Sequence, residues 1–281
     1  MGILKAELDK VRRLGWTYLA ILGMNAFSAA MFLIFLILYL KSTALDQAAQ
    51  VSLQMERQAG TLLYFVFVTE TWVFSFLGFF FMGILIGELV GREFDNGSVG
   101  LLFMSPYSRL SVFAAKVTSV LFVYLFSLTL SFCIQASTVL LLSRVHSVFL
   151  RIIEPMTLVK LFAANILIDL SWIALMFMLS TLSRGVASTL AYTLFVYFSL
   201  LLLDTIIWLG GQFEFLGPWL VKAGAFTFTN SCRVLDAKQV ASYFSRSTLD
   251  FPLAFNLLGL NVGYTVLFVL LAALAFSRRE I

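Results

Sequence analysis

Charged side chains are scarce in this chain: only 12% of its 281 residues are Asp, Glu, Lys or Arg, whereas 61% are hydrophobic. A soluble globular domain carries roughly 25% charged residues and about 45–50% apolar ones. The scarcity of charge therefore excludes an ordinary soluble domain and predicts an integral membrane protein. The net charge of +4 is spread along the chain, so it does not indicate binding to nucleic acid.

Cysteine and histidine are also rare. The chain has two cysteines, Cys133 and Cys232, and one histidine, His146. Since no CxxC motif or Cys/His cluster occurs, the sequence disfavours a metal site built from these residues. One cysteine lies in an apolar run and the other in a polar loop, which disfavours a disulfide between them. The GxxxxGK[ST] phosphate loop is absent too, so hydrolysis of ATP by that route is not expected.

Long apolar runs are what the sequence has in abundance. Runs of about 18 or more apolar residues predict transmembrane helices, whereas strands of a membrane barrel alternate polar and apolar residues. We therefore expect an all-α membrane protein with six transmembrane helices. The predicted spans cover residues 17–40, 62–90, 111–142, 157–182, 186–210 and 254–276. The first run is too long for the core of a signal peptide, so we interpret it as a retained span.

The distribution of Lys and Arg predicts the orientation. With the N-terminus inside, the inner segments hold ten of these bases and the outer segments hold nine. The inner segments are much shorter, so their density of bases is about twice as high, as is typical of cytoplasmic loops. Arg12-Arg13 and Arg278-Arg279 also lie directly beside predicted spans. We therefore expect a multi-pass protein of the plasma membrane with both termini in the cytoplasm.

The first sixteen residues, MGILKAELDKVRRLGW, form a separate amphipathic segment. On a helix with about 100° per residue, its apolar and basic side chains occupy opposite arcs, and only Glu7 intrudes on the apolar arc. The apolar arc comprises Ile3, Leu4, Leu8, Val11 and Leu14. This pattern predicts an interfacial helix over residues 1–16, followed by a transmembrane domain over residues 17–281. The alternative is an ordinary basic N-terminus that only sets the orientation.

The predicted cytoplasmic loop at about residues 91–110 is rich in charge and turn signals. Asp95-Asn96-Gly97 favours a turn, Ser98 can cap a short helix, and Pro106 ends that helix. The helix would present apolar side chains at the cytoplasmic face. Such a surface is typical of a partner-binding site, although the loop could instead pack against its own bundle.

The same loop carries a resemblance to a known family. Its residues run Glu93-Phe94-Asp95-Asn96-Gly97-Ser98, then Leu101-Leu102, Ser105-Pro106, Ser108-Arg109 and Lys116. This order resembles the pattern of ABC-2 type permeases, in which an acidic segment precedes Gly-Thr or Gly-Ser, two leucines, Pro-x-Ser-Arg and a lysine early in span three. The six spans, the amphipathic start and an apolar, re-entrant-like outer loop at about residues 211–252 also match this type V exporter architecture.

The resemblance implies partners and a mechanism. Permeases of this kind dimerise, as homodimers or heterodimers, and bind two copies of a separate ABC-type ATPase, which holds ATP and Mg²⁺. The permease is then not an enzyme and holds no cofactor itself. The helix at about residues 98–104 would act as a coupling helix in a cleft of the ATPase. The residues implied to form this coupling site are Glu93, Asp95, Gly97, Ser98, Leu101, Leu102, Phe103, Pro106 and Arg109.

Four acids lie inside predicted spans, where a charge is costly and therefore indicates a functional site. Asp169 is nearest to the middle of the membrane, and Asn165 lies one turn away on the same face. Glu88 lies near the inner end of its span, where it can pair with Arg92. The residues predicted to line a translocation path are Glu70, Asn165, Asp169 and Asp204. Hydrogen bonding between helices is the alternative role for Asn165 and Asp169.

Two other functions stay open on the sequence alone. One is a six-span scaffold that recruits a cytoplasmic partner other than an ATPase. The other is a secondary transporter that is driven by an ion gradient and uses Asp169. The sequence does not indicate the transported substrate.

Overall fold

The computed structural model describes residues 2–46, 79–96, 107–145, 155–183, 185–210, 227 and 251–278. The secondary structure of these residues is helical, and no strand occurs among them. A helix satisfies its backbone N–H and C=O groups internally, which is why it is stable in lipid. The prediction of an all-α protein is therefore confirmed for the described residues.

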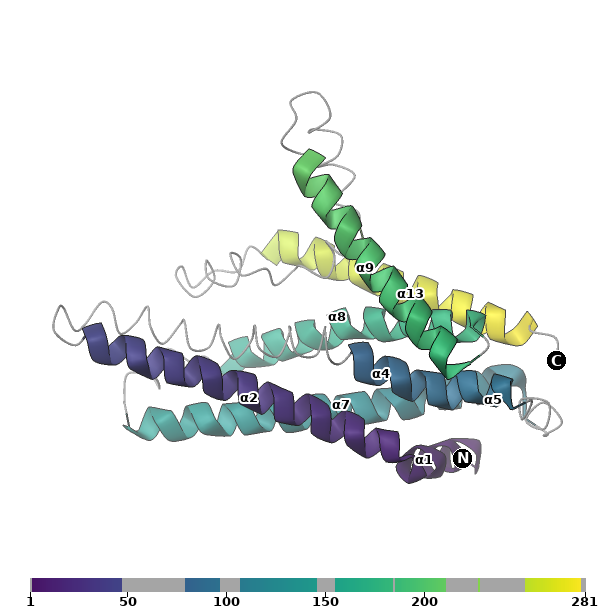
Figure 1. Ribbon diagram of the computed structural model, residues 1–281, viewed down its shortest axis with the longest axis horizontal. Coiled ribbons are helices and arrows are strands. Elements are labelled where there is room, and N and C mark those ends of the chain that lie inside the picture. The colour runs from purple at the N-terminus through teal and green to yellow at the C-terminus, as the bar shows by residue number, and fades with distance from the viewer. Residues whose placement is uncertain are drawn as a thin grey trace.

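The described helices follow one another along the chain (Figure 1). The N-terminal pair is α1 (Gly2–Arg13) and α2 (Gly15–Asp46). Next come α4 (Phe79–Ile86), the π-helical turn η2 (Gly87–Gly91) and α5 (Arg92–Asp95), which form one continuous helical rod. The remaining helices are α7 (Arg109–Val145), α8 (Pro155–Leu182), α9 (Val186–Gly210) and α13 (Phe251–Arg278).

Within the described part of the chain, four helices are long and apolar enough to cross a membrane. Their apolar segments are Gly15–Ile34 in α2, Arg109–Ile134 in α7, Val186–Ile207 in α9 and Leu258–Arg278 in α13. The segment Ile166–Leu182 of α8 is a shorter apolar helix. The predicted second span, residues 62–90, is described only from Phe79 onward, so the total of six spans stays a prediction. The outer loop at residues 211–252 lies outside the described residues, apart from Thr227 and the start of α13.

The helices pack side by side into a bundle from which α9 diverges (Figure 1). α8 lies along α13, whereas α7 contacts both α1 and α2. The buried apolar side chains come mainly from α4, η2, α7 and α8, and they include Leu85, Leu89, Tyr124 and Phe177. Both chain ends lie at the end of the bundle that also contains α1 and α5 (Figure 1).

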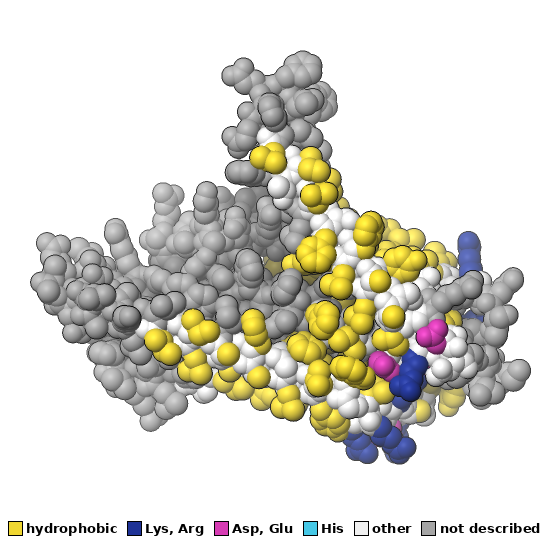
Figure 2. Space-filling model, viewed as in Figure 1, with side chains coloured by type: hydrophobic (Ala, Val, Ile, Leu, Met, Phe, Trp, Pro, Cys, Tyr) yellow, Lys and Arg dark blue, Asp and Glu magenta, His cyan; other side chains and the backbone are white. Residues whose placement is uncertain are grey.

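Charge and apolar surface are separated along the bundle. On the face drawn in Figure 2, the described Lys, Arg, Asp and Glu side chains gather near α1 and α5, whereas hydrophobic side chains cover α2 and α9. Exposed leucines on these helices, such as Leu22 and Leu202, are 69% and 63% accessible. A surface of this kind suits contact with lipid along the helices and contact with water at the charged end.

Three glycines let η2 approach α9 closely. Gly83, Gly87 and Gly91 are spaced four residues apart and therefore lie on one face of the helix. A Cβ atom on Gly91 would lie 2.9 Å from the carbonyl carbon of Gly185, and one on Gly87 would lie 3.3 Å from Val186 Cγ1. Small residues at this spacing let two helix backbones meet in a membrane. The sequence carries this signal as GxxxGxxxG, and our sequence analysis missed it.

Candidate functional site

A cluster of ionised side chains is buried where α1, α5 and α7 meet. It consists of Lys116 on α7, Glu7 and Lys10 on α1, and Glu93 on α5, and we call it the charge clamp. Lys116 is 0% exposed, Glu7 is 5% exposed and Glu93 is 7% exposed. Removing charges from water is costly, so such a group is stable only when every member has partners.

The ammonium of Lys116 is fully satisfied by groups from three parts of the chain. Lys116 Nζ donates to Glu7 Oε1 at 3.0 Å, and it lies 2.7 Å from Glu93 Oε2. It also donates to the backbone carbonyl of Leu89 in η2 at 3.2 Å. A further bond to Glu7 Oε2 at 3.2 Å brings the surrounding oxygens to four, which is enough for the three N–H donors of an ammonium.

Lys10 completes the clamp at its edge. Its ammonium donates to Glu93 Oε1, so that Glu93 is held by a base on each of its two oxygens. The four side chains carry two positive and two negative charges, so their sum is zero when all are ionised. Burial lowers the pKa of Lys10 to about 8, the charge of Lys116 adds to this shift, and Glu7 opposes it.

The π-helical turn determines which way α5 presents Glu93. In η2 the Arg92 N–H donates to the Gly87 carbonyl, five residues back rather than four. A single π turn inserts one residue into the helical repeat and rotates everything that follows it, and such turns are frequent at functional sites. Glu93 follows the turn directly and points inward to the clamp, whereas Arg92 points outward and donates to Glu88 Oε2 at 2.9 Å. The predicted pairing of Glu88 with Arg92 is therefore confirmed.

Glu7 has a buried partner, Lys116, that our sequence analysis missed. It was the one acid on the apolar arc of the N-terminal segment, and it is the residue that reaches Lys116. The same face of α1 packs against α7, where Val11 is only 2% exposed. An acid within an otherwise apolar face is thus a signal for a buried base on the opposing helix. That α1 lies at a membrane surface stays a prediction.

The predicted coupling site is described only at its two ends. Glu93 belongs to the clamp, and Asp95 lies against the turn between α8 and α9, since a Cβ on Gly185 would be 2.6 Å from Asp95 Oδ2. Arg109 donates to the Ser277 carbonyl near the end of α13 at 2.8 Å. The residues that lie outside the described part of the chain are Gly97, Ser98, Leu101, Leu102, Phe103 and Pro106.

Aromatic packing supports the same anchoring. The rings of Phe94 and Phe276 meet edge to face with centroids 5.9 Å apart, and Phe276 also packs against Phe113 at 5.5 Å. At the other end of the segment, Tyr107 lies beside the start of α1, where a Cβ on Gly2 would be 3.0 Å from its hydroxyl oxygen. The described residues that flank 97–106 thus contact α1, the turn before α9, and α13.

Of the four residues predicted to line a translocation path, only Asp169 has a described side chain, so the path stays a prediction. Asp169 on α8 is 6% exposed and accepts a hydrogen bond from the Tyr124 hydroxyl on α7 at 2.5 Å. Asn165 lies on α8 and Asp204 lies on α9, but the described part of the chain does not include their side chains, and Glu70 lies outside it entirely. The contact observed for Asp169 is therefore the helix-to-helix hydrogen bond, which was the alternative interpretation.

Further neutral hydrogen bonds join α2 to α7. Asn25 donates to Ser127 Oγ at 2.9 Å, and one turn along, the hydroxyls of Ser28 and Ser131 are 2.8 Å apart. All four side chains are buried or nearly so. Polar bonds of this kind hold helices together where neither lipid nor water competes for them. The spacing of three and four residues could have indicated them from the sequence.

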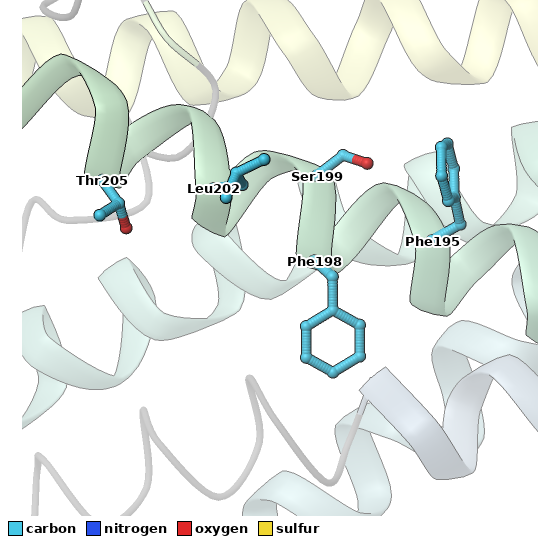
Figure 3. A pocket seen from close by; sticks show the side chains of 5 residues that line it. All are labelled: Phe195, Phe198, Ser199, Leu202 and Thr205. Atoms are coloured by element: carbon cyan, nitrogen blue, oxygen red, sulfur yellow. The ribbon is translucent and has the colours of Figure 1, made fainter.

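A shallow apolar groove runs along α9 (Figure 3). Its lining comes from one helix and comprises Phe195, Phe198, Ser199, Leu202 and Thr205. The two phenylalanines are 69% and 58% exposed. None of the described lining residues is charged, and among the described residues no group of His, Cys, Asp and Glu is arranged to hold a metal. The described lining therefore offers a mainly apolar contact surface.

Comparison with known proteins identifies the family of this chain. The family described as ABC-2 family transporter protein matches residues 3–200, which is 198 of the 281 residues. The match includes the clamp, Asp95 and Arg109, and it ends within α9. No curated protein matches the chain.

Proposed function

Because this chain belongs to the ABC-2 transporter family, we propose that it is the permease of an ATP-driven exporter whose ATPase is a separate subunit. The family is one of membrane subunits of ABC transporters, and the apolar helices agree with a multi-pass membrane protein. Our proposal adds that two permease copies, identical or not, pair with two copies of the ATPase. ATP and Mg²⁺ would then belong to the ATPase alone.

The observation that carries the proposal is that the residues on both sides of 97–106 contact other helices of the bundle. Upstream, Glu93 is held by Lys116 of α7, and Asp95 lies against the turn that begins α9. Downstream, Arg109 is bonded to the end of α13. A push on this segment would therefore be transmitted directly to three apolar helices. Binding of ATP to the ATPase can switch the bundle between two conformations only if it favours one of them. Contacts of this kind would carry that preference from the ATPase to the helices.

The arrangement of charge supports the orientation that we propose. α1, α5 and both chain ends share one end of the bundle (Figure 1), and the charged side chains of the drawn face gather there (Figure 2). We propose that this end faces the cytoplasm, with six spans and with α1 along the inner membrane surface. The positive-inside rule favours this orientation, since Arg12, Arg13, Arg92 and Arg278 belong to this end.

Changing one leucine of the segment tests the coupling. Leu102→Asp places a charge on the apolar surface that we expect to enter the ATPase, so co-purification of the ATPase with the permease should fall at least tenfold. Leu182→Asp is the matched control, because Leu182 is 60% exposed at the end of α8 and lies outside the segment. The control should retain the ATPase.

The outcomes separate the proposed function from its alternatives. A Leu102→Asp complex that survives and keeps its ATPase coupled would overturn the assignment of the coupling segment. Failure of any ABC-type ATPase to co-purify with the unaltered chain would favour the scaffold. Transport that collapses with the proton gradient while ATP is still present would favour a secondary transporter.

A further inference from the structure

We propose that Lys116 is a positioning residue that locks α1 to α5 at the exit of the second span, so that α1 and α5 move as one body. The proposal deepens the proposed function and rests on it for the identity of the driving partner. Its core is the geometry of the charge clamp, which the structure shows in this chain alone.

The first argument is that one ammonium holds two separate elements. Glu7 lies 109 residues before Lys116 in the chain, and the Leu89 carbonyl lies 27 residues before it. Because Lys116 is 0% exposed and its ammonium is surrounded by oxygens of Glu7, Glu93 and Leu89, the contact is shielded from solvent. If α1 moved away alone, Glu7 and Lys116 would each lose a buried partner, which is strongly unfavourable.

The second argument is the position of Glu93. It lies four residues before Gly97, on the helical rod formed by α4, η2 and α5. Its two oxygens are bound by Lys116 of α7 and Lys10 of α1, so it ties this rod to both helices. Any displacement of Glu93 must therefore carry α1 and the start of α7 with it or break the clamp.

The third argument is that an apolar contact would suffice if only attachment were needed. α1 already packs an apolar face against α7, with Val11 buried. Replacing a buried charge group by apolar side chains of similar size is often neutral or stabilising, so such a group is weak evidence for stability. The hydrogen bonds of Lys116 are directional, so they define one position of α1 relative to α7, whereas two apolar faces can slide past each other. The contact therefore fits a role in fixing the position of α1.

The test measures the position of α1 directly with pairs of spin labels in lipid nanodiscs. Cys133 and Cys232 are first replaced by serine. One pair places labels at Arg13→Cys on α1 and Leu182→Cys on α8, since both positions are exposed. The reference pair combines Phe122→Cys on α7 with the same Leu182→Cys, because Phe122 is 63% exposed. The unaltered clamp should give a narrow distance distribution for both pairs.

Neutral substitutions then remove the three buried charges of the clamp and leave only Lys10, whose side chain is 38% exposed. The triple variant is Lys116→Met, Glu7→Gln, Glu93→Gln. In it, the distribution of distances between the labels on α1 and α8 should widen at least twofold, while that between the labels on α7 and α8 stays narrow. Ser119→Ala is the matched control, because Ser119 is also fully buried on α7 and bonds only the Lys116 carbonyl, so it should change neither pair. An α1–α8 distribution as narrow in the triple variant as in the parent would overturn the proposal.

A second measurement asks whether the two elements move together. Labels at Arg13→Cys and Asn96→Cys, an exposed position beside residue 97, report the distance from α1 to the exit of the second span. With the ATPase and a non-hydrolysable nucleotide, this distance should stay constant in the parent and change in the triple variant. A change of equal size in both would overturn the joint motion. If no ATPase binds the parent protein, the proposed function is wrong. The distance measurement in nanodiscs without ATPase still shows whether Lys116 fixes the position of α1.

Discussion

The N-terminal end and the middle of α7 are held by different chemistry. At its N-terminal end, Lys116 is bound by two carboxylates from α1 and α5. Further along, the contacts are the Tyr124 hydroxyl with Asp169 and the hydroxyls of Ser127 and Ser131 with α2. Full charges cost most where water is farthest, so the clustered ion pairs lie where the described charges gather, and mid-span contacts rely mainly on uncharged donors. The difference indicates a fixed joint at one end and ordinary helix packing in the middle.

Breaking the clamp should have the largest effect. Lys116→Met leaves Glu7 and Glu93 without their shared base, and removing one partner of a buried ion pair costs about 3–5 kcal/mol. We expect a large fall in the thermal unfolding temperature of the purified protein. The triple neutral variant should recover most of that loss, because it leaves no unpaired carboxylate in the clamp. Equal unfolding temperatures for the single and triple variants would contradict the view that buried charges hold the N-terminal end of α7 and uncharged donors hold its middle.

The mid-span contact should be weaker. Tyr124→Phe removes the hydroxyl that donates to Asp169 and leaves the ring in place. Hydrogen bonds between membrane helices contribute on average about 0.6 kcal/mol and at most about 1.7 kcal/mol. Combining Tyr124→Phe with Asp169→Asn in a double-mutant cycle of unfolding free energies should give a coupling within that range. A coupling as large as that of the clamp would remove the contrast between the two regions.

The smallest effect concerns Lys10, at the edge of the clamp. Its pKa is lowered to about 8, whereas the unfolded chain keeps the ordinary value near 10.5. Between these two values the unfolded state binds more protons than the folded state, so this group makes the folded state more stable as the pH rises from about 8 to about 10.5. Below pH 8 it adds no pH dependence.

Amine labelling checks this value. The rate of acylation at Lys10, followed by mass spectrometry, should rise with a midpoint near pH 8. Lys5 is exposed and serves as the internal reference for the reagent. The Glu93→Gln variant shows whether the contact with α5 protects Lys10, because its labelling should become faster. A midpoint for Lys10 near 10.5 would contradict the burial of its ammonium.

Much of the helical framework follows from the sequence because long apolar runs permit only one kind of secondary structure in lipid. The predicted starts and ends of the third, fourth and fifth spans fall within a few residues of α7, α8 and α9. The amphipathic pattern of the first sixteen residues likewise predicted a helix where α1 forms. These are local properties, since each depends only on neighbours along the chain.

The site was predicted less completely. The sequence identified Glu93, Asp95 and Arg109 as flanks of one segment, and it included Lys116 in the family pattern, but it gave no partner for any of them. Glu7 stood out only as an exception to an apolar arc. The translocation path at Asp169 stays a prediction, and the contact observed for this residue is the bond from Tyr124.

The sequence by itself determined that the chain is a helical membrane protein of the ABC-2 family with a charged segment between two apolar rods, because composition and local order are enough for these properties. Only the tertiary structure decided that Lys116 joins Glu7 to Glu93. It also decided that the residues on both sides of 97–106 contact other helices. The physical reason is that an ion pair depends on which distant residues share a buried volume. That volume is created by the packing of α1 against α7 and by the rotation that η2 gives to α5.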